Sequence, residues 1–139
     1  MDQLPCSPKE EIEGLVYFRR LCEKVRLMAA GKLPHDLHAN LGKAMDLWAC
    51  QFLGVEYDDL AERIRAGLTD EEVFSWAVEN GSPRDVNEIA WWNSYMRNVG
   101  FRDGLSQRLV ERIEESGLGE RADNIRTMFD YIDADEGRA

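Results

Sequence analysis

Long hydrophobic runs are absent from this sequence of 139 residues. Its longest stretches of consecutive apolar residues are four residues long and lie at positions 15–18, 27–30, 47–50 and 89–92. A helix that crosses a bilayer needs about 20 predominantly apolar residues in succession. We therefore expect no membrane partner. Because the first residues also lack the pattern of a secretory signal peptide, we expect a soluble protein that is not exported.

Cysteine is scarce as well. Cys6, Cys22 and Cys50 are too few and too scattered for the disulfide framework of a small secreted domain. Cys22 falls among the apolar positions of a predicted helix, which is typical of a buried free thiol. These features predict a cytoplasmic protein. They do not indicate its oligomeric state.

Positive charge is in short supply: 17 basic residues stand against 27 acidic ones, a net charge of -10. Such a field repels nucleic acid and anionic lipid, so we expect neither as a partner. The excess of acid lies entirely in residues 51–139, whereas residues 1–50 are neutral and contain all four lysines, the last of them Lys43. An anionic ligand is therefore expected only at the N-terminal third.

The common catalytic motifs are missing. The chain has no glycine-rich phosphate loop, no paired-histidine metalloprotease motif, no G-x-S-x-G and no C-x-x-C. No cofactor is predicted. His35 and His38 form an H-x-x-H, but a zinc site needs three or four converging ligands and would have to recruit Cys22 or Cys50. We favour polar loop residues over ligands and predict no metal site.

Helix signals, by contrast, are abundant. Apolar residues recur at helical spacing over residues 15–30, and Gly31 follows in the position that a left-handed C-cap prefers. The first helix starts either at residue 8, after a Ser7-Pro8 cap, or beyond the break at Gly14. Similar cap, stripe and stop signals predict further helices at about 41–53, 58–66, 70–80, 83–98, 104–116 and 124–132.

No segment alternates like a strand, and no dipeptide suggests a hairpin. The sequence therefore predicts an all-α fold, a compact orthogonal bundle of six or seven short helices. Its length suits a single domain over residues 1–139, with a loose N-terminus at 1–7 and an acidic tail at 133–139. The acids at its C-terminal end do not fit the calcium-loop pattern and are interpreted as solvated: Asp130, Asp133, Asp135 and Glu136.

Asp46 is the most informative charged residue. It lies on the apolar reverse side of the second helix, between Leu47 and Leu53, where an unpaired carboxylate would be costly. We predict a partner on the polar side of the first helix, either Arg20 or Lys24. A buried ion pair that orients two helices is favoured over a catalytic acid. The basic cluster around Arg20 and Lys24 either grips an external anion or, as we favour, pairs with the protein's own acids.

The Trp91-Trp92 pair suggests a surface with a purpose. Trp92 shares an apolar stripe with Ile89 and Met96 and is predicted to be core, whereas Trp91 points about 100° away. Trp91 either packs beneath a neighbouring element, which we favour, or presents an apolar face to a partner. Asn93 also lies within the stripe, so its amide must be satisfied by the backbone or by a ligand.

Seven short segments form a recognisable set: Arg20–Arg26, Leu37–Gly42, Asp46, Phe52–Val55, Thr69–Trp76, Trp92-Asn93 and Phe129–Arg138. From about Ser7 to Arg138 this set resembles a family of bacterial proteins of unknown function, DUF5069. The chain departs from the family's pattern at Arg19, where a proline often opens the first helix. It also has Ala49-Cys50 where relatives carry paired cysteines or Gln-Arg.

The resemblance implies a bacterial cytoplasmic protein with a compact helical fold, and it implies no activity. It places five of the candidates above at recurring motif positions: Arg20, Lys24, Asp46, Trp92 and Asn93. We favour a non-enzymatic module that binds a protein or a small molecule. The alternative is a small enzyme, hydrolase or lyase-like, or an anionic-ligand binder, with a cleft around Arg20, Lys24, Asp46 and Asn93. In that hypothesis Asp46 is the acid or base, and Arg20 clamps the anion.

Overall fold

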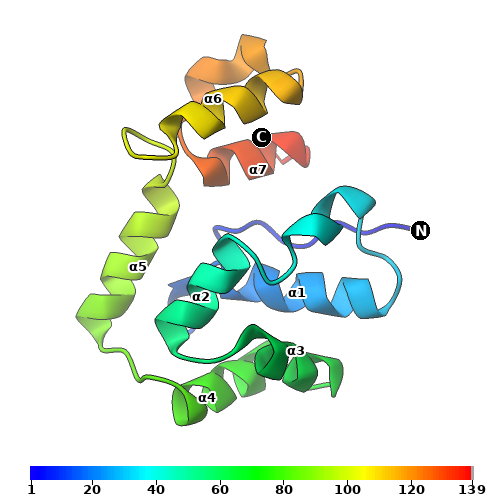
Figure 1. Cartoon of the computed structure of the whole chain (residues 1–139), viewed down its shortest axis with the longest axis vertical. Helices are drawn as coiled ribbons and strands as arrows, with labels where there is room; N and C mark the ends of the chain where they lie inside the picture. Colours follow the sequence, from blue (N-terminus) through cyan, green and yellow to red (C-terminus); the bar gives the residue numbers. More distant parts are fainter. Residues whose placement is uncertain (139) are drawn as a thin grey trace.

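The computed structural model describes residues 1–138 and is almost entirely helical (Figure 1). Within these residues, the α-helices are α1 Phe18–Ala29, α2 Met45–Leu53, α3 Tyr57–Arg65, α4 Asp70–Asn80, α5 Val86–Asn98, α6 Ser106–Glu115 and α7 Met128–Asp135. The 3-10 helices η1 and η2 span His35–Asn40 and Gly119–Asn124, and the strands β1 and β2 span Glu11–Ile12 and Leu15–Val16. The predicted all-α fold with short helices is confirmed. No helix in this part of the chain is both long and apolar enough to cross a bilayer.

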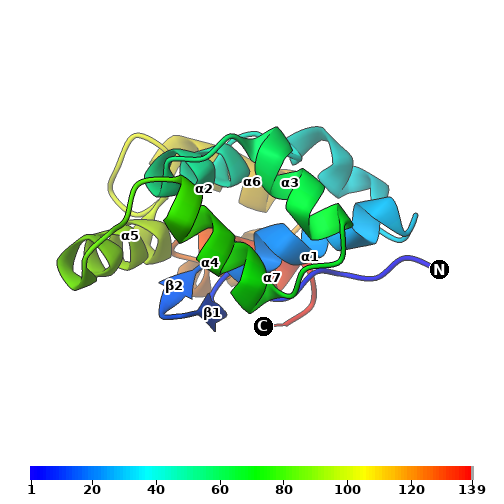
Figure 2. The ribbon, with the colours of Figure 1, turned by 90° about the horizontal axis from the view of Figure 1, so that it is seen from below.

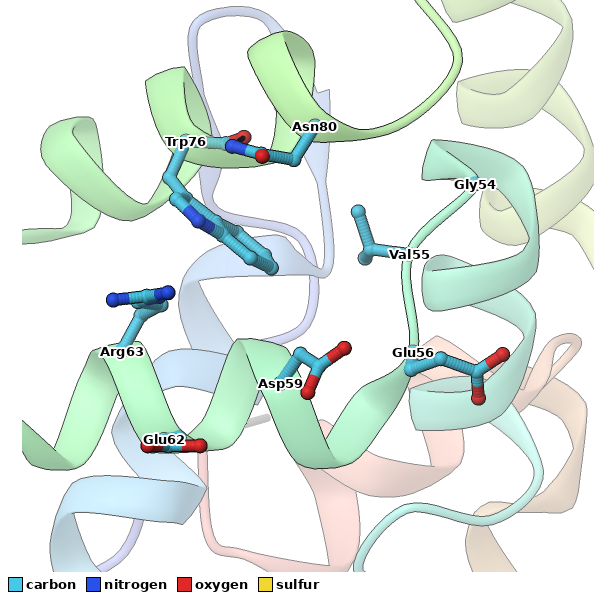
Figure 3. A pocket seen from close by; sticks show the side chains of 8 residues that line it. All are labelled: Gly54, Val55, Glu56, Asp59, Glu62, Arg63, Trp76 and Asn80. Atoms are coloured by element: carbon cyan, nitrogen blue, oxygen red, sulfur yellow. Dashed lines mark hydrogen bonds between the residues drawn. The ribbon is translucent and has the colours of Figure 1, made fainter.

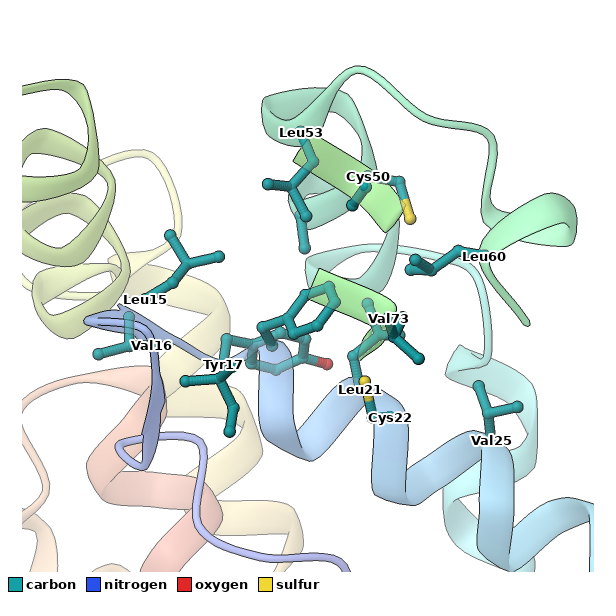
Figure 4. Close-up of a cluster of buried hydrophobic side chains, with 14 of the residues drawn as sticks. Leu15, Val16, Tyr17, Leu21, Cys22, Val25, Cys50, Leu53, Leu60 and Val73 are labelled. Atoms are coloured by element: carbon teal, nitrogen blue, oxygen red, sulfur yellow. The ribbon is translucent and has the colours of Figure 1, made fainter. Parts of the chain in front are cut away.

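The molecule has two lobes, each with its own cluster of buried apolar side chains. The N-terminal lobe comprises the strands and α1–α5, and its core gathers Leu21 and Val25 of α1 with residues of α2, α3 and α4 (Figure 4). The C-terminal lobe comprises α6, η2 and α7, around a smaller core that includes Leu109 and Ile113. In Figure 1, α5 runs along one edge and connects the lobes. Phe129 of α7 is fully buried in the larger core, so α7 joins the two lobes.

Local sequence signals determine several helix boundaries. The Thr69 side chain accepts a hydrogen bond from the Glu72 N–H, and the Glu72 carboxylate accepts one from the Thr69 N–H, which completes the predicted capping box of α4. Asp85 and Glu88 form the same reciprocal cap at the start of α5. Each box satisfies two backbone donors that the first turn of a helix leaves free.

Residues 8–17 do not extend the first helix. The sequence predicted no strand here, and that prediction is wrong. β1 and β2 form a small antiparallel hairpin in which Ile12 pairs with Leu15. Glu13 and Gly14 make the turn with φ of 51° and 78°, the positive values that a tight hairpin turn requires. Since each strand is only two residues long, it displays no alternation for sequence analysis to detect.

Side chains of α5 hold this hairpin in place. The Asn93 Oδ1 accepts a hydrogen bond from the Val16 N–H at 3.0 Å, and its Nδ2 donates to the Gly14 carbonyl at 2.7 Å. The Trp92 indole N–H donates to the Val16 carbonyl at 3.1 Å, while its ring stacks on Phe52. Trp92 is 7% exposed, which confirms its predicted place in the core. Backbone groups therefore satisfy the Asn93 amide.

Two other helix starts differ from expectation. The second helix begins at Met45 because residues 35–40 form η1 and Ala44 adopts a positive φ. The last helix begins at Met128, where Thr127 caps it, because residues 119–124 form η2. Asn40 and Asp123 are common N-cap residue types, but here the chain makes another short turn before each helix.

Both predicted tails make contacts with the rest of the chain over the described residues. The Gln3 N–H donates to the Lys32 carbonyl at 2.8 Å, and Pro5 is buried. At the other end, Asp133 is 7% exposed, and Glu136 forms ion pairs. Figure 2 shows both chain ends on the side of the molecule where α1 and α7 lie. Ala139, the last residue of the predicted tail, lies outside the described residues.

Replacement of Asn93 by alanine tests the attachment of the hairpin. Asn93→Ala leaves the Val16 N–H without its acceptor, and we expect the free energy of unfolding to fall by about 1–3 kcal/mol. The control is Asn98→Ala, because Asn98 is an exposed residue of the same helix that bonds only to the Ser94 carbonyl. We expect that variant to lie within about 0.5 kcal/mol of the unmodified protein. Urea unfolding followed by circular dichroism measures both, and equal stabilities would contradict the role given to Asn93.

Candidate functional site

A cleft of about 620 Å³ separates the two lobes. Its lining residues include members of α1, η1 and the start of α2 in one lobe and of α6 and α7 in the other, and Figure 1 shows how these helices are arranged. The N-terminal lobe lines it with Tyr17, Arg20, Lys24, Asp36, Leu37, Asn40, Lys43, Ala44 and Met45. The C-terminal lobe lines it with Arg108, Arg112, Glu115, Ser116, Met128, Tyr131, Ile132, Asp135 and Glu136. Its volume is in the range typical of small-molecule sites.

Three buried side chains meet at the floor of the cleft. The Lys24 Nζ lies 3.0 Å from the Asp46 Oδ1 and 3.3 Å from the Tyr17 hydroxyl, which itself donates to the Asp46 Oδ1 at 2.6 Å. The Gly42 N–H donates to the other Asp46 oxygen at 3.0 Å. Asp46 is fully buried and Lys24 is 4% exposed. The predicted pairing of Asp46 with a cation of the first helix is confirmed, and the cation is Lys24.

Burial changes the acid–base properties of this cluster. It lowers the pKa of Lys24, although the neighbouring Asp46 carboxylate acts in the opposite direction. It raises the pKa of the Tyr17 phenol, as does the charge of Asp46. A lysine ammonium has three N–H donors, and the structure gives Lys24 two acceptors within residues 1–138. No third acceptor for the Lys24 ammonium is found among residues 1–138, and Lys24 is one of the residues that line the cleft.

The backbone is strained on both sides of this cluster. Tyr17, just before α1, has φ 76° and ψ -33°, and Ala44, just before α2, has φ 49° and ψ -120°. Neither is a glycine, and such conformations cost about 1–3 kcal/mol each. Both residues line the cleft. Strain of this kind tends to collect at sites where side chains must be held in a fixed position for binding or catalysis.

Arg20 does not pair with Asp46 and is not free to clamp an anion, contrary to the alternative hypothesis. Its guanidinium forms a two-pronged ion pair with Glu136, the residue that directly follows α7, at 2.8 and 2.6 Å. The same guanidinium donates to the Cys6 carbonyl at 3.0 Å. Arg20 therefore closes one end of the cleft by fastening α7 to α1.

Two other cations of the cleft have no acid bound to them within the described residues. Lys43 is exposed in the loop just before α2, and Arg112 is half-buried on α6. Neither forms an ion pair with residues 1–138, whereas Arg108 beside them pairs with Glu111. Lys43 was visible in the sequence as the last lysine of the neutral N-terminal third. Nothing local to α6 distinguished Arg112, because the fold alone brings it to the cleft.

The remaining candidates lie elsewhere. Trp92 and Asn93 face the hairpin and do not line the cleft. Trp91 is 69% exposed, so the expected packing of this ring beneath a neighbouring element is wrong. Tyr95 and Leu47 are also exposed, and the Tyr95 ring meets Trp48 edge-on. Trp91 and Tyr95, one turn apart on α5, form what we term the aromatic face.

The histidines do not gather further ligands. The rings of His35 and His38 lie 5.2 Å apart, and the His38 Nε2 is 2.9 Å from the Leu33 carbonyl. Cys22 and Cys50 are buried in the N-terminal core. Within residues 1–138, no third cysteine, histidine or acid joins the two rings in a metal-ligating group. The fold thus does not bring together the residues of the zinc hypothesis.

A second pocket of about 410 Å³ lies between α3 and α4 (Figure 3). The carboxylates of Glu56, Asp59 and Glu62 line one side and the indole of Trp76 the other. The Arg63 guanidinium already lies over the Trp76 ring, 5.5 Å from its centre. Since the protein's own cation occupies the aromatic wall, this pocket is a weaker candidate than the cleft.

Comparison with known proteins gives a family and nothing further. The domain of unknown function DUF5069 matches residues 2–138. The chain therefore belongs to the DUF5069 family, as the sequence segments indicated. No curated protein matches it, and no solved structure does.

Removal of the Lys24 charge tests how much the buried Lys24–Asp46 pair contributes to the free energy of unfolding. Lys24→Met leaves the Asp46 carboxylate buried without its cation, and we expect a loss of about 3–5 kcal/mol in the free energy of unfolding. Lys9→Met is the control, because the Lys9 side chain is half-exposed and its pairs with Asp130 and Asp133 should together contribute about 1 kcal/mol, less than the buried Lys24–Asp46 pair. Chemical denaturation measures both. A Lys24 variant no less stable than the Lys9 variant would show that the buried pair is not required.

Acid should weaken the Arg20–Glu136 ion pair that attaches α7 to α1. Burial opposes ionisation of Glu136, but the hydrogen bonds and charges of Arg20 and Arg138 outweigh it and lower the pKa of the carboxyl from its usual 4.5. The stabilisation is therefore complete above about pH 4.5 and disappears as the pH falls through the lower, folded-state pKa. We expect Glu136→Gln to reduce the acid-dependent loss of unfolding free energy, while Glu114→Gln on the exposed face of α6 leaves it unchanged. Identical pH profiles for the two variants would refute the link.

Proposed function

We propose that this DUF5069 protein is a binding protein for a small organic anion, which it holds in the cleft between its lobes. The observation that carries the proposal is the set of cationic donors left open there. Lys24 lines the cleft with two acceptors for its three N–H donors among residues 1–138, and Lys43 and Arg112 line it from opposite lobes without acids of their own.

Lys43 and Arg112 are unpaired cations that line the same cleft, although unpaired cations such as Lys32 and Arg65 also occur elsewhere on the surface of residues 1–138. Acids outnumber bases by 27 to 17, so a surface arginine or lysine has many carboxylates within reach. Most cations near the cleft are indeed paired, including Arg20 with Glu136 and Arg108 with Glu111. Lys43 and Arg112 differ from them. Their position favours a negative group that comes from outside the protein.

Apolar side chains between the cations favour an organic ligand over an inorganic ion. Leu37 and Met45 line the cleft from the N-terminal lobe, and Met128 and Ile132 line it from α7. Such surfaces contact a carbon skeleton, while the charged groups fix its anionic end. Acids at the same cleft, such as Glu115 and Asp135, disfavour an extended polyanion such as nucleic acid.

A second candidate function is protein binding through the aromatic face. Trp91 is 69% exposed and Tyr95 is 52% exposed, a large aromatic surface for so small a protein. Tryptophan and tyrosine are enriched in protein interfaces. This observation supports the interaction-module hypothesis independently of the cleft, because none of the residues of the aromatic face lines the cleft.

Isothermal titration with hexanoate, succinate and inorganic phosphate tests the cleft. We expect the carboxylates to bind more tightly than phosphate. The double variant Lys43→Ala/Arg112→Ala should weaken carboxylate binding by about tenfold or more, because each charge-assisted hydrogen bond contributes about 1.5–3 kcal/mol.

The double variant Lys32→Ala/Arg65→Ala is the matched control. It removes the same charge from exposed positions outside the cleft. Trp91→Ala should also bind carboxylates normally, which separates the two candidate functions. Equal losses in the cleft and control variants, or no binding of any of the three anions, would exclude the proposed function.

A further inference from the structure

We propose that Lys24 forms an imine with the carbonyl group of a 2-oxo carboxylate bound in the cleft. This inference rests on the proposed function, because the cations of the cleft must hold the carboxylate of that substrate. It adds covalent chemistry to binding and names the substrate class.

The geometry of the floor supplies the parts that imine formation needs. The amine is that of Lys24, one of the residues that line the cleft, and the Asp46 carboxylate hydrogen-bonded to it is fully buried. A carboxylate that can take a proton, Asp46, lies 3.0 Å from this nitrogen. The Tyr17 hydroxyl lies 3.3 Å from the nitrogen and bridges to the same Asp46 oxygen, so a proton has a short path between the groups.

The environment of Lys24 favours access to the neutral amine. Burial lowers the pKa of Lys24, the Asp46 charge opposes this, and the nearby Arg20 cation lowers it further. Desolvation and a neighbouring cation are the conditions that activate lysine nucleophiles. Lys43 has no such burial, since it is exposed at the edge of the cleft.

The reaction is balanced without any further reagent. The Lys24 ammonium transfers one proton to Asp46, and the nitrogen lone pair forms a bond to the carbonyl carbon. One proton then moves from nitrogen to the former carbonyl oxygen, which gives a carbinolamine. Asp46 returns its proton to the nitrogen, with which it is in contact, and the nitrogen passes one proton to the hydroxyl. The carbon–oxygen bond then breaks and water leaves. A protonated imine remains, with the charge that the ammonium carried at the start.

Tyr17 acts as a positioning residue in this scheme. Its backbone is held at φ 76° immediately before α1, and its ring packs 6.3 Å from that of Phe129. The phenol is therefore fixed from two sides, with its hydroxyl on Asp46. Lys43 and Arg112 are the groups in reach of the cleft that can hold the substrate carboxylate.

Reductive trapping tests the inference on the unmodified protein. The protein is incubated with pyruvate and sodium cyanoborohydride, and peptide mass mapping locates lysines that gain one pyruvate less one oxygen. We expect Lys24 to be modified about tenfold faster than Lys9 and Lys32, because a bound substrate is held next to it. Modification that favours Lys43 or the other exposed lysines over Lys24 would overturn the inference.

Variants separate a chemical role from a structural one. Lys24→Arg keeps the cation beside Asp46 but cannot form the imine, so trapping at this position should disappear while circular dichroism remains unchanged. Tyr17→Phe should slow trapping without abolishing it, and Asp46→Asn should slow it more strongly. If Lys24→Arg fails to fold, the peptide map of the unmodified protein still decides the question.

Lactate distinguishes failure of this inference from failure of the proposed function. It has the same carboxylate as pyruvate but no carbonyl. Binding of lactate, measured by titration and abolished in Lys43→Ala/Arg112→Ala, together with no trapping of pyruvate at Lys24, would refute the imine and leave the binding function intact. Trapping of neutral acetone at Lys24 as fast as pyruvate would refute the 2-oxo carboxylate class.

Discussion

A carboxylate buried inside the N-terminal lobe is the constraint on which much of the structure depends. Asp46 has no exposed surface, and an isolated charge in such a place would be strongly unfavourable. Lys24, the Tyr17 hydroxyl and the Gly42 N–H together satisfy its two oxygens. These partners come from α1, from the residue before it and from the loop before α2. The buried Asp46 carboxylate thus helps to fix how α1 and α2 pack together.

The second lobe is attached by a different ion pair. Glu136, directly after α7, binds Arg20, which lies one turn before Lys24 on α1. Phe129 places the other end of α7 against Tyr17. The two cations of α1 are therefore used in different ways. The Arg20 guanidinium binds Glu136 and so attaches α7 to α1. Lys24 lines the resulting cleft and has two hydrogen-bond acceptors among residues 1–138 for its three N–H donors. The cleft is a consequence of how α7 is fastened.

The sequence predicted features that depend on neighbours and missed those that depend on distant segments. The Thr69 capping box and the core position of Trp92 follow from spacings of three or four residues, and both are confirmed. The burial of Asp46 followed from helical periodicity. The partner of Arg20 lies 116 positions away and belongs to a segment that looked like a solvated tail. The hairpin escaped detection because two-residue strands carry no period, and Arg112 because only the fold brings α6 to the cleft.

The energetic cost of the Lys24–Asp46 pair and of the strained backbone beside it bears on whether the pair has only a structural role. A buried ion pair is weak evidence for stability, since well-packed apolar residues of similar volume often serve as well or better. Here the pair is accompanied by strained backbone at Tyr17 and Ala44, each of which costs further stability. Selection for folding stability alone would favour neither the buried ion pair nor the strained backbone. Local departures from the most stable choice are expected where a protein must hold reactive groups in place. Both strained residues and Lys24 line the same cleft, so the costs coincide in space with the open donors. That coincidence favours a site built for a ligand over a pair that only fixes two helices.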